Sequence, residues 1–307
     1  MEIKQGGFNA IKKHTVWNFL FPLYPLSVFK NTKLMAYLAI LISLRLIFSI
    51  VSIPIPGFVQ NISFSWVPLM VAGWYFGPVV GFFFGWVTDT LCYLIFTSGI
   101  WFWMYAIQES CVCVISGIFG FVYRTRSQSK HLKIWIDLLA QQIIYFLFGA
   151  ICLGALLSWA DPGNVAGKFD GKYDFYKVLA LCLMALFIII MEFVTVYQYH
   201  TYKENKSHLL LFIYGTTLVV LLMEIFSFAI GPIATVEYLR ALNGKLPAKF
   251  EQYGLIVYLI PKVIIQSVKD PFESFLFVGI IWALTPSFDN MLNGLNSRWD
   301  VNKWFSN

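Results

Sequence analysis

Nine ionisable side chains lie within long apolar stretches of this 307-residue sequence. They are Arg45, Asp89, Glu109, Glu192, Glu224, Lys262, Lys269, Asp270 and Glu273. A charge is costly in the hydrocarbon of a membrane, so such residues face the interior of a helix bundle, pair with one another or line the route of a polar solute. These residue types therefore suggest the binding of a charged or strongly polar molecule.

Five of these residues are predicted to lie at a similar depth. Arg45 is about eight residues from the end of its apolar stretch, and Asp89, Glu109, Glu224 and Lys262 lie at similar positions on theirs, which corresponds to about 10–12 Å below one membrane surface. A layer of two basic and three acidic groups indicates a polar cavity. Structural roles explain the same pattern, with Arg45 and Asp89 as a buried ion pair or Glu224 as a protonated acid.

The other four charges are predicted to have local roles. Glu192 lies nearer the opposite surface, where its side chain can reach the interface. Lys269, Asp270 and Glu273 lie deeper on that side, and we expect them to pair locally or to meet a partner protein.

Motifs of soluble catalysis are absent from the sequence. It contains no P-loop, no GxSxG and no HExxH motif. Its four histidines form no cluster, and its five cysteines lie in apolar runs without metal-type spacing. We therefore expect no enzyme activity, no ATPase within this chain, no metal site and no permanently bound cofactor.

The elements that must position these charges are membrane-spanning helices. Hydrophobic residues make up 59% of the chain and charged residues 12%, against about 25% charged in soluble domains. The apolar runs are long and do not alternate with polar residues, which predicts an all-α, polytopic membrane helix bundle. Breaks at Pro, Gly and polar loops divide it into about eight spans, near residues 34–53, 62–76, 78–96, 101–123, 134–159, 176–197, 208–230 and 253–286.

The distribution of Lys and Arg orients these spans. With the N-terminus inside, thirteen of the 22 Lys and Arg residues fall in cytoplasmic segments and six in outer loops. The sequence therefore predicts a multi-pass protein of the cell membrane with both termini in the cytoplasm. The net charge of +6 is then explained by anionic lipid at the inner face, and no nucleic-acid partner is expected.

Small and aromatic residues suggest contacts between helices and with a ligand. Ala39 and Ser43 are four residues apart on the first span, and such faces allow another membrane helix to approach closely. The glycines between residues 73 and 85 have the same spacing, and we expect them to pack inside the bundle. Trp66 and Trp101 lie near span ends, either as interfacial anchors or as stacking surfaces for a flat ring.

Several stretches resemble one family. The run Ile62–Gly81 (ISFSWVPLMVAGWYFGPVVG) is similar to a hallmark of the substrate-binding S components of energy-coupling factor (ECF) vitamin transporters. The folate-specific S component is the most similar subgroup. The other stretches that carry the resemblance are Thr88–Phe96, Leu44–Arg45 with Ser52–Pro54, and Ile260–Lys262 with Pro271–Glu273.

The resemblance implies a six-helix core, a transmembrane coupling subunit and two ATP-binding subunits as partners. It also implies that Ala39 and Ser43 contact the coupling subunit, and that the first outer loop, with Pro54, Pro56 and Gly57, closes over the ligand. Eight spans exceed six, so we expect an inserted transmembrane hairpin. The expected organisation is a cytoplasmic segment at 1–33, helices 1–4 at 34–123, the hairpin with basic flanks at 124–207, helices 5–6 at 208–286 and a cytoplasmic tail at 287–307.

The expected function is the import of a folate, in its oxidised or reduced form. An acid such as Asp89 or Glu109 suits the pterin ring, and Arg45 or Lys262 suits the anionic tail, with Trp66 and Trp101 as stacking residues. Alternatives are an S component for pantothenate, riboflavin or a queuosine precursor, a stand-alone proton-coupled transporter, and a membrane enzyme that acts on lipid.

Overall fold

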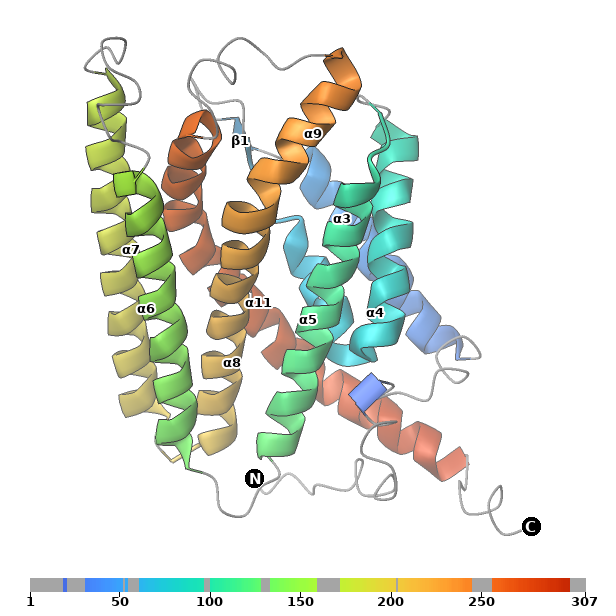
Figure 1. Cartoon of the computed structure of the whole chain (residues 1–307). Coiled ribbons are helices and arrows are strands. Elements are labelled where there is room, and N and C mark those ends of the chain that lie inside the picture. The colour runs from blue at the N-terminus through green and yellow to red at the C-terminus, as the bar shows by residue number, and fades with distance from the viewer. Residues whose placement is uncertain are drawn as a thin grey trace.

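The computed structural model describes residues 19–20, 31–51, 53–54, 61–96, 100–127, 133–158, 172–202, 204–244 and 256–298. These residues form a bundle of long helices and one short two-stranded antiparallel ladder (Figure 1). The elements are α3 (Thr32–Ile50), β1 (Ile53–Pro54), β2 (Asn61–Ile62), α4 (Trp66–Phe96), α5 (Trp103–Ser127), α6 (Ile134–Ser158), α7 (Lys172–Thr201), α8 (Lys206–Leu222), the π-helix η1 (Met223–Ile230), α9 (Gly231–Asn243) and α11 (Ile256–Arg298).

The predicted fold class is confirmed. Seven helical segments in the described part of the chain are long and apolar enough to cross a membrane, and α8, η1 and α9 together form one of them, Lys206–Asn243. Their outward faces carry large apolar side chains, as expected where lipid is the solvent. The protein is therefore a polytopic helical membrane protein.

The difference between seven segments and the eight predicted spans is explained by α4. Gly77 interrupts this helix with φ 84° and ψ 175°, a conformation that is essentially restricted to glycine. An ideal Cβ at Gly81 would lie 3.3 Å from the Cα atom of Gly73, whereas residues eight apart in a straight helix are about 12 Å apart. The chain therefore reverses at Gly77, and the predicted second and third spans are two arms of one helical hairpin.

The first arm, residues 66–76, is too short to cross a membrane. Eleven residues extend about 16 Å, roughly half of the hydrocarbon thickness. The arm begins inside the bundle, directly after β2, which pairs antiparallel with β1. At its other end Arg124 of α5 donates a hydrogen bond of 2.8 Å to the Trp74 carbonyl oxygen and so satisfies a carbonyl at the elbow.

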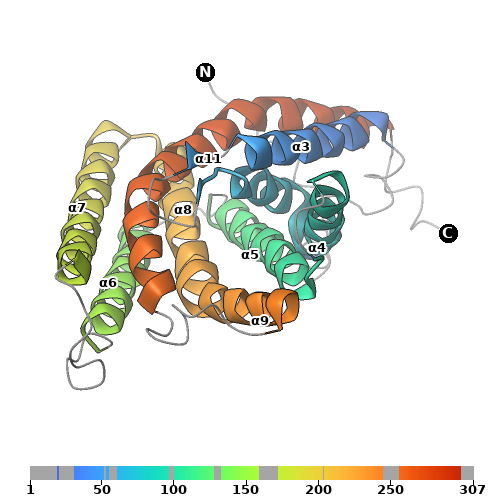
Figure 2. The same cartoon turned by 90° about the horizontal axis from the view of Figure 1, so that it is seen from above.

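The main core lies between α3, both arms of α4, α5, α8 and α11. Its fully buried large side chains include Trp74 and Phe76 of α4, Leu34 of α3 and Phe277 of α11. Seen from above, α3 lies alongside the C-terminal half of α11 (Figure 2), and the Tyr37 and Ser287 hydroxyl groups are hydrogen bonded at 2.5 Å. The core therefore joins the first and last helices of the bundle.

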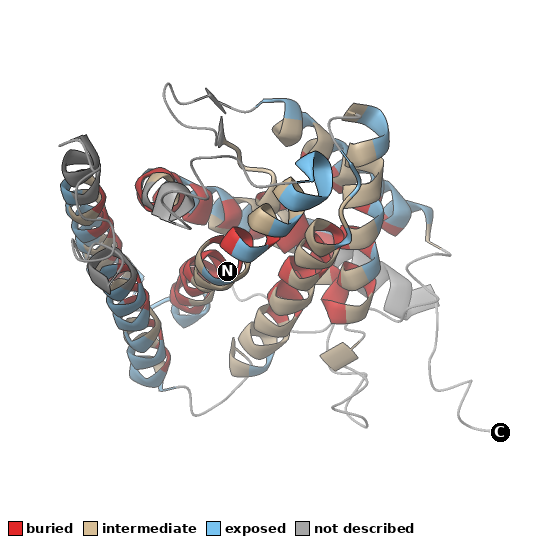
Figure 3. Ribbon diagram, turned by 45° about the horizontal axis from the view of Figure 1, so that its top comes forward, coloured by how far each residue is buried: buried red, intermediate tan, exposed pale blue. Residues whose placement is uncertain are grey.

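Helices α6 and α7 form a separate layer on one side of the bundle, away from α3 (Figure 2). A second buried cluster, including Phe148 and Phe187, packs them against Val220 of α8 and Val263 of α11. Their outward faces are exposed (Figure 3). Helices α8 and α11 thus contact both layers, and Arg126 of α5 also forms an ion pair with Asp137 of α6.

Candidate functional site

The predicted site residues lie in different places. Arg45, Asp89, Glu109 and Trp101 gather between α3, the second arm of α4 and α5. Lys262 interacts electrostatically with the charges of α11 near Trp66. Glu224 lies in η1, where it interacts with Cys152 of α6. The layer of charges that depth alone predicts is therefore divided into three environments.

Arg45 and Glu109 form a buried ion pair. The Arg45 guanidinium donates through Nη2 to Oε1 of Glu109 and through Nη1 to Oγ of Ser49. The two residues are only 8% and 6% exposed. The pair joins α3 to α5, and removal of one partner would leave the other charged in a nearly water-free site.

Asp89 lies beside this ion pair, and Arg45, Glu109, Asp89 and Trp101 together form the first polar cluster. Asp89 is partly exposed, interacts electrostatically with both Arg45 and Glu109, and is hydrogen bonded to the side chain of Trp101. Ser49 also contacts Cys92, with 3.8 Å between Oγ and Sγ. This cluster holds one basic and two acidic groups, so it is poorly suited to bind the anionic end of a ligand.

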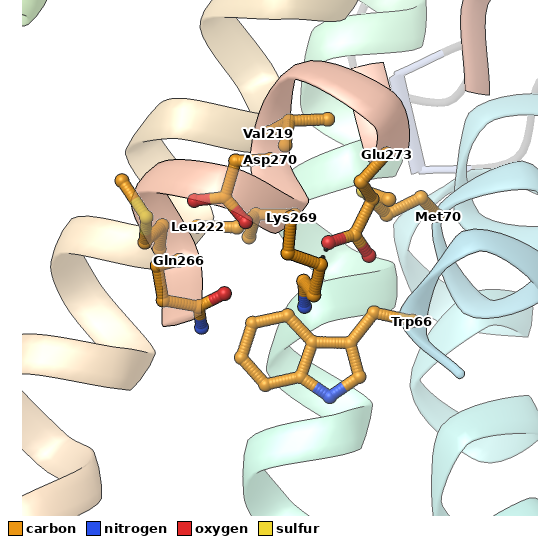
Figure 4. A pocket seen from close by; sticks show the side chains of 9 residues that line it. Trp66, Met70, Val219, Leu222, Gln266, Lys269, Asp270 and Glu273 are labelled. Atoms are coloured by element: carbon orange, nitrogen blue, oxygen red, sulfur yellow. Dashed lines mark ion pairs between the residues drawn. The ribbon is translucent and has the colours of Figure 1, made fainter. Parts of the chain in front are cut away.

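A second polar cluster lies on one face of α11. Gln266, Lys269, Asp270 and Glu273 are three or four residues apart, so a helix brings them to the same side. Together with Trp66 and Met70 of α4, Val219 and Leu222 of α8 and Met223 of η1 they line a pocket (Figure 4). All four α11 residues are buried, including Asp270 at 1% exposure and Glu273 at 2%.

Lys269 lies at the centre of this pocket. Its Nζ atom is 2.8 Å from Oε2 of Glu273 and 5.6 Å from the centroid of the Trp66 ring system. Figure 4 shows the ammonium group between the carboxylate of Glu273 and the indole ring. The ammonium is thus stabilised by an ion pair and by a cation–π contact.

Three acceptor atoms of the pocket residues accept no hydrogen bond within the described part of the chain. These are Oε1 of Gln266, Oδ2 of Asp270 and Oε1 of Glu273. The Gln266 amide is held in place, since its Nε2 donates to Oγ of Ser227 at 2.7 Å. A buried acceptor without a donor costs about 1–3 kcal/mol, so the pocket favours a molecule that brings N–H or O–H groups.

The pocket is narrow in this conformation. Its side chains leave no space that a water molecule could fill, whereas typical small-molecule sites have about 300–1,000 Å³. Binding of a vitamin-sized ligand therefore requires the first arm of α4, α8 and α11 to move apart. The Tyr75 hydroxyl of the first arm is hydrogen bonded to the Ile281 carbonyl oxygen and the Thr285 hydroxyl of α11, so this movement has to leave or break these contacts.

The sequence analysis did not place Lys269, Asp270 and Glu273 in the candidate site. The signal was present, because positions 262, 266, 269, 270 and 273 share one helical face. The local pairing expected for them is found between Lys269 and Glu273. Of the two predicted tryptophans, Trp66 belongs to this pocket, whereas Trp101 belongs to the first cluster.

The remaining predicted residues have mixed positions. Ala39 and Ser43 are exposed on the outward face of α3, and the Ser43 hydroxyl donates to the Ala39 carbonyl oxygen at 2.9 Å. Pro54 lies in β1, whereas Pro56 and Gly57 fall outside the described residues. Glu192 accepts a hydrogen bond of 2.9 Å from Gln142 of α6, so its carboxylate is held between α6 and α7. The described residues contain no group of three or more potential metal ligands.

Comparison with known proteins identifies the family. Residues 33–192 match the family described as ECF transporter, substrate-specific component. Two uncharacterised proteins, from Mycoplasma pneumoniae and Mycoplasma genitalium, are 33% and 30% identical to the chain over 91% of its length and 99% of theirs. The folate transporter FolT of Clostridium novyi is 31% identical over 91 residues, which are 29% of this chain and 52% of that protein. No solved structure is significantly similar.

The family match covers α3, α4, α5 and α6 and most of α7, which together make up more than half of the chain. Its members are membrane transport subunits, in agreement with the seven membrane-spanning segments. The chain therefore belongs to the family of ECF transporter substrate-specific components.

Proposed function

We propose that this protein is the substrate-binding subunit of an ECF-type ABC transporter that imports a folate. The observation that carries the proposal is the pocket of Trp66, Gln266, Lys269, Asp270 and Glu273, which places an indole face, a cation and acceptors without donors inside a membrane bundle. A folate has the matching parts, namely a flat pterin with an N–H-rich edge and a carboxylate-bearing tail. The likeness to FolT over part of the chain supports the same substrate.

The roles of the pocket residues follow from their chemistry. Trp66 provides a stacking surface for the pterin. Asp270 and Glu273 accept hydrogen bonds from its amino group and ring N–H, a geometry in which carboxylates bind strongly. Lys269 and the nearby Lys262 attract the carboxylates of the tail. Arg45 and Glu109, expected to touch the ligand, are assigned instead to holding α3 against α5.

The proposed assembly has the chain oriented with both termini in the cytoplasm. It would associate with a transmembrane coupling subunit through Ala39 and Ser43 of α3, and two ATP-binding subunits would supply the energy. We infer that α6 and α7 are the inserted hairpin, because α8 and α11 pack against α4 and α5 in the core while α6 and α7 pack on α8 and α11. The hairpin lies away from α3 and leaves that face accessible (Figure 2).

Ligand binding to the purified protein tests the substrate. We expect folic acid or a reduced folate to bind saturably with one ligand per chain in isothermal titration calorimetry, and riboflavin and pantothenate not to bind. Glu273→Gln should weaken folate binding, and the matched variant Glu237→Gln, which alters an exposed ion pair with Arg240, should not. Binding of another vitamin in place of every folate would contradict the folate assignment and keep the transport role.

Reconstitution tests the mode of transport. Folate uptake into vesicles should require the coupling subunit, the two ATP-binding subunits and ATP. Uptake by this chain alone, driven by a proton gradient, would contradict the proposed ECF mechanism and favour a self-sufficient transporter.

A further inference from the structure

We propose that Lys269 occupies the ligand's place against Trp66, and that binding splits the Lys269–Glu273 ion pair so that each charge takes a different end of the ligand. The inference rests on the proposed function and names the two chemical features its substrate must combine. One is a flat ring with an N–H donor edge, and the other is an anionic group.

The ammonium group of Lys269 covers one face of the Trp66 ring system. Lys269 is 8% exposed, and its Nζ atom lies 5.6 Å from the centroid of the Trp66 ring system. A flat ring stacked on an indole needs that same face of the tryptophan at a similar separation. Lys269 and a stacked ligand therefore exclude each other at Trp66.

The carboxylates around Lys269 have acceptor atoms to spare. Glu273 uses Oε2 to bind the ammonium, whereas its Oε1 and the Oδ2 of Asp270 accept no hydrogen bond from the described residues. Both carboxylates are at least 98% buried and line the same pocket. A ring edge with two neighbouring N–H donors would take over Glu273 from the ammonium and satisfy acceptors that the protein leaves without a donor.

A displaced Lys269 needs a new partner for its charge. A buried charge that loses its partner is strongly unfavourable unless a new partner replaces the old one. Asp270 and Glu273 would be engaged by the ring edge, and Lys262 has the same charge as Lys269. An anionic group on the ligand is therefore the partner that makes the exchange favourable, and a ring without that group should bind weakly.

Three probes and two variants test the exchange. The probes are folic acid, which has both features, 6-methylpterin, which has the ring alone, and 4-aminobenzoylglutamate, which has the anionic part alone. In the wild-type protein folic acid should bind at least a hundredfold more tightly than either fragment. In Lys269→Met we expect folic acid to lose at least tenfold in affinity and 6-methylpterin to keep or gain affinity, because the ring no longer has to break an ion pair to reach Glu273.

The charge-swapped variant Lys269→Glu/Glu273→Lys guards against a folding defect in Lys269→Met. It retains an ion pair at the same two positions, so its melting temperature in detergent should be close to that of the wild-type protein. Folic acid binding should nevertheless be lost, because each charge now faces the wrong end of the ligand. Glu237→Gln on α9 serves as the matched control in which affinity for all three probes is unchanged.

Two results would overturn the inference while the proposed function stands. One is an equal loss of folic acid and 6-methylpterin affinity in Lys269→Met. The other is wild-type folic acid affinity in the charge-swapped variant. If the wild-type protein binds none of the three probes, both the inference and the folate substrate are overturned.

Discussion

Arg45 and Glu109 show how this protein accommodates charge in its interior. Both are buried, and the guanidinium donates to the carboxylate of Glu109 on one side and to Ser49 on the other. Mutual pairing replaces the solvation that water would provide, and it does so between α3 and α5. The pair should therefore matter more to the association of these helices than to the ligand.

Neutralising Arg45 and Glu109 singly and together tests whether the pair stabilises the association of α3 and α5. We expect Arg45→Met and Glu109→Gln each to lower stability by about 3–5 kcal/mol, because one buried charge then lacks its partner. The double variant should recover much of this loss. Thermal unfolding in detergent measures the effect, and Glu237→Gln, which disrupts an exposed pair, should shift the transition little. If the double variant is as unstable as the sum of the singles, the two residues act independently and the pairing argument is wrong.

Residues of α11 explain why the candidate site was only partly predictable. Counting depth from the ends of an apolar stretch assumes a straight span of ordinary length. Helix α11 has 43 residues and contains Pro261, Pro271 and Pro286, and depth alone does not reveal that Lys269, Asp270 and Glu273 share a helical face with Lys262. Trp66 was equally ambiguous, because a tryptophan at the start of a span normally marks the interface, whereas the half-length arm of α4 begins inside the bundle.

At the scale of elements, the close approach of α4 and α5 is made possible by glycine. An ideal Cβ at Gly73 would lie 2.0 Å from the carbonyl oxygen of Cys113, and one at Gly85 would lie 2.6 Å from the backbone nitrogen of Ser110. These contacts are with backbone atoms, which cannot move aside as a flexible side chain can. The sequence analysis predicted that these glycines pack inside the bundle, and the structure confirms it for both arms of α4.

A pair of glycine substitutions measures this packing. Gly73→Ala should destabilise the protein by about 1–3 kcal/mol or more, because the added methyl group forces α4 and α5 apart. Gly279→Ala on α11 is the matched control, since nothing lies within 4 Å of its ideal Cβ. The control should be neutral or stabilising by up to about 1 kcal/mol, because alanine favours a helix. Equal thermal unfolding curves in detergent for the two variants would contradict the close-packing interpretation.

At Gly77 the sequence predicted the break in the helix but not the reversal of the chain. Gly77–Pro78 was correctly expected to end one helix and begin another. A break in a helix does not reveal whether the chain continues in the same direction or reverses. The reversal depends on contacts of the arms with α5, such as Arg124 with the Trp74 carbonyl oxygen, and these contacts link residues 50 positions apart.

At the scale of the whole molecule, the distribution of Lys and Arg predicts how the protein is oriented in the membrane. One helical segment allows this orientation to be tested. The segment Lys206–Asn243 has 38 residues and extends about 57 Å, well beyond the about 30 Å of hydrocarbon. Ser207 and Asn243 are exposed near its two ends, so they should lie on opposite sides of the membrane.

Cysteine labelling separates the two orientations. In a variant whose native cysteines are replaced by alanine, a membrane-impermeant maleimide should label Asn243→Cys in intact cells. It should label Ser207→Cys only after the membrane is permeabilised. The reverse pattern would place the termini outside and contradict the positive-inside assignment.

The arrangement of the two layers makes a final prediction about assembly. Ala39 and Ser43 are exposed on α3, and the Ser43 hydroxyl is satisfied by the Ala39 carbonyl oxygen, so this face offers small side chains to a neighbouring helix. Helices α6 and α7 lie on a different side of the bundle (Figure 2). A coupling subunit can therefore approach α3 without meeting the hairpin.

Bulky substitutions on the two faces test this geometry. Ala39→Trp should reduce co-purification with the coupling subunit at least tenfold, because the ring holds the partner helix away, and it should leave folate binding by the isolated chain unchanged. Leu186→Trp, at an exposed position of α7, is the matched control and should assemble normally. The opposite result, with assembly lost only in Leu186→Trp, would assign the docking role to α6 and α7.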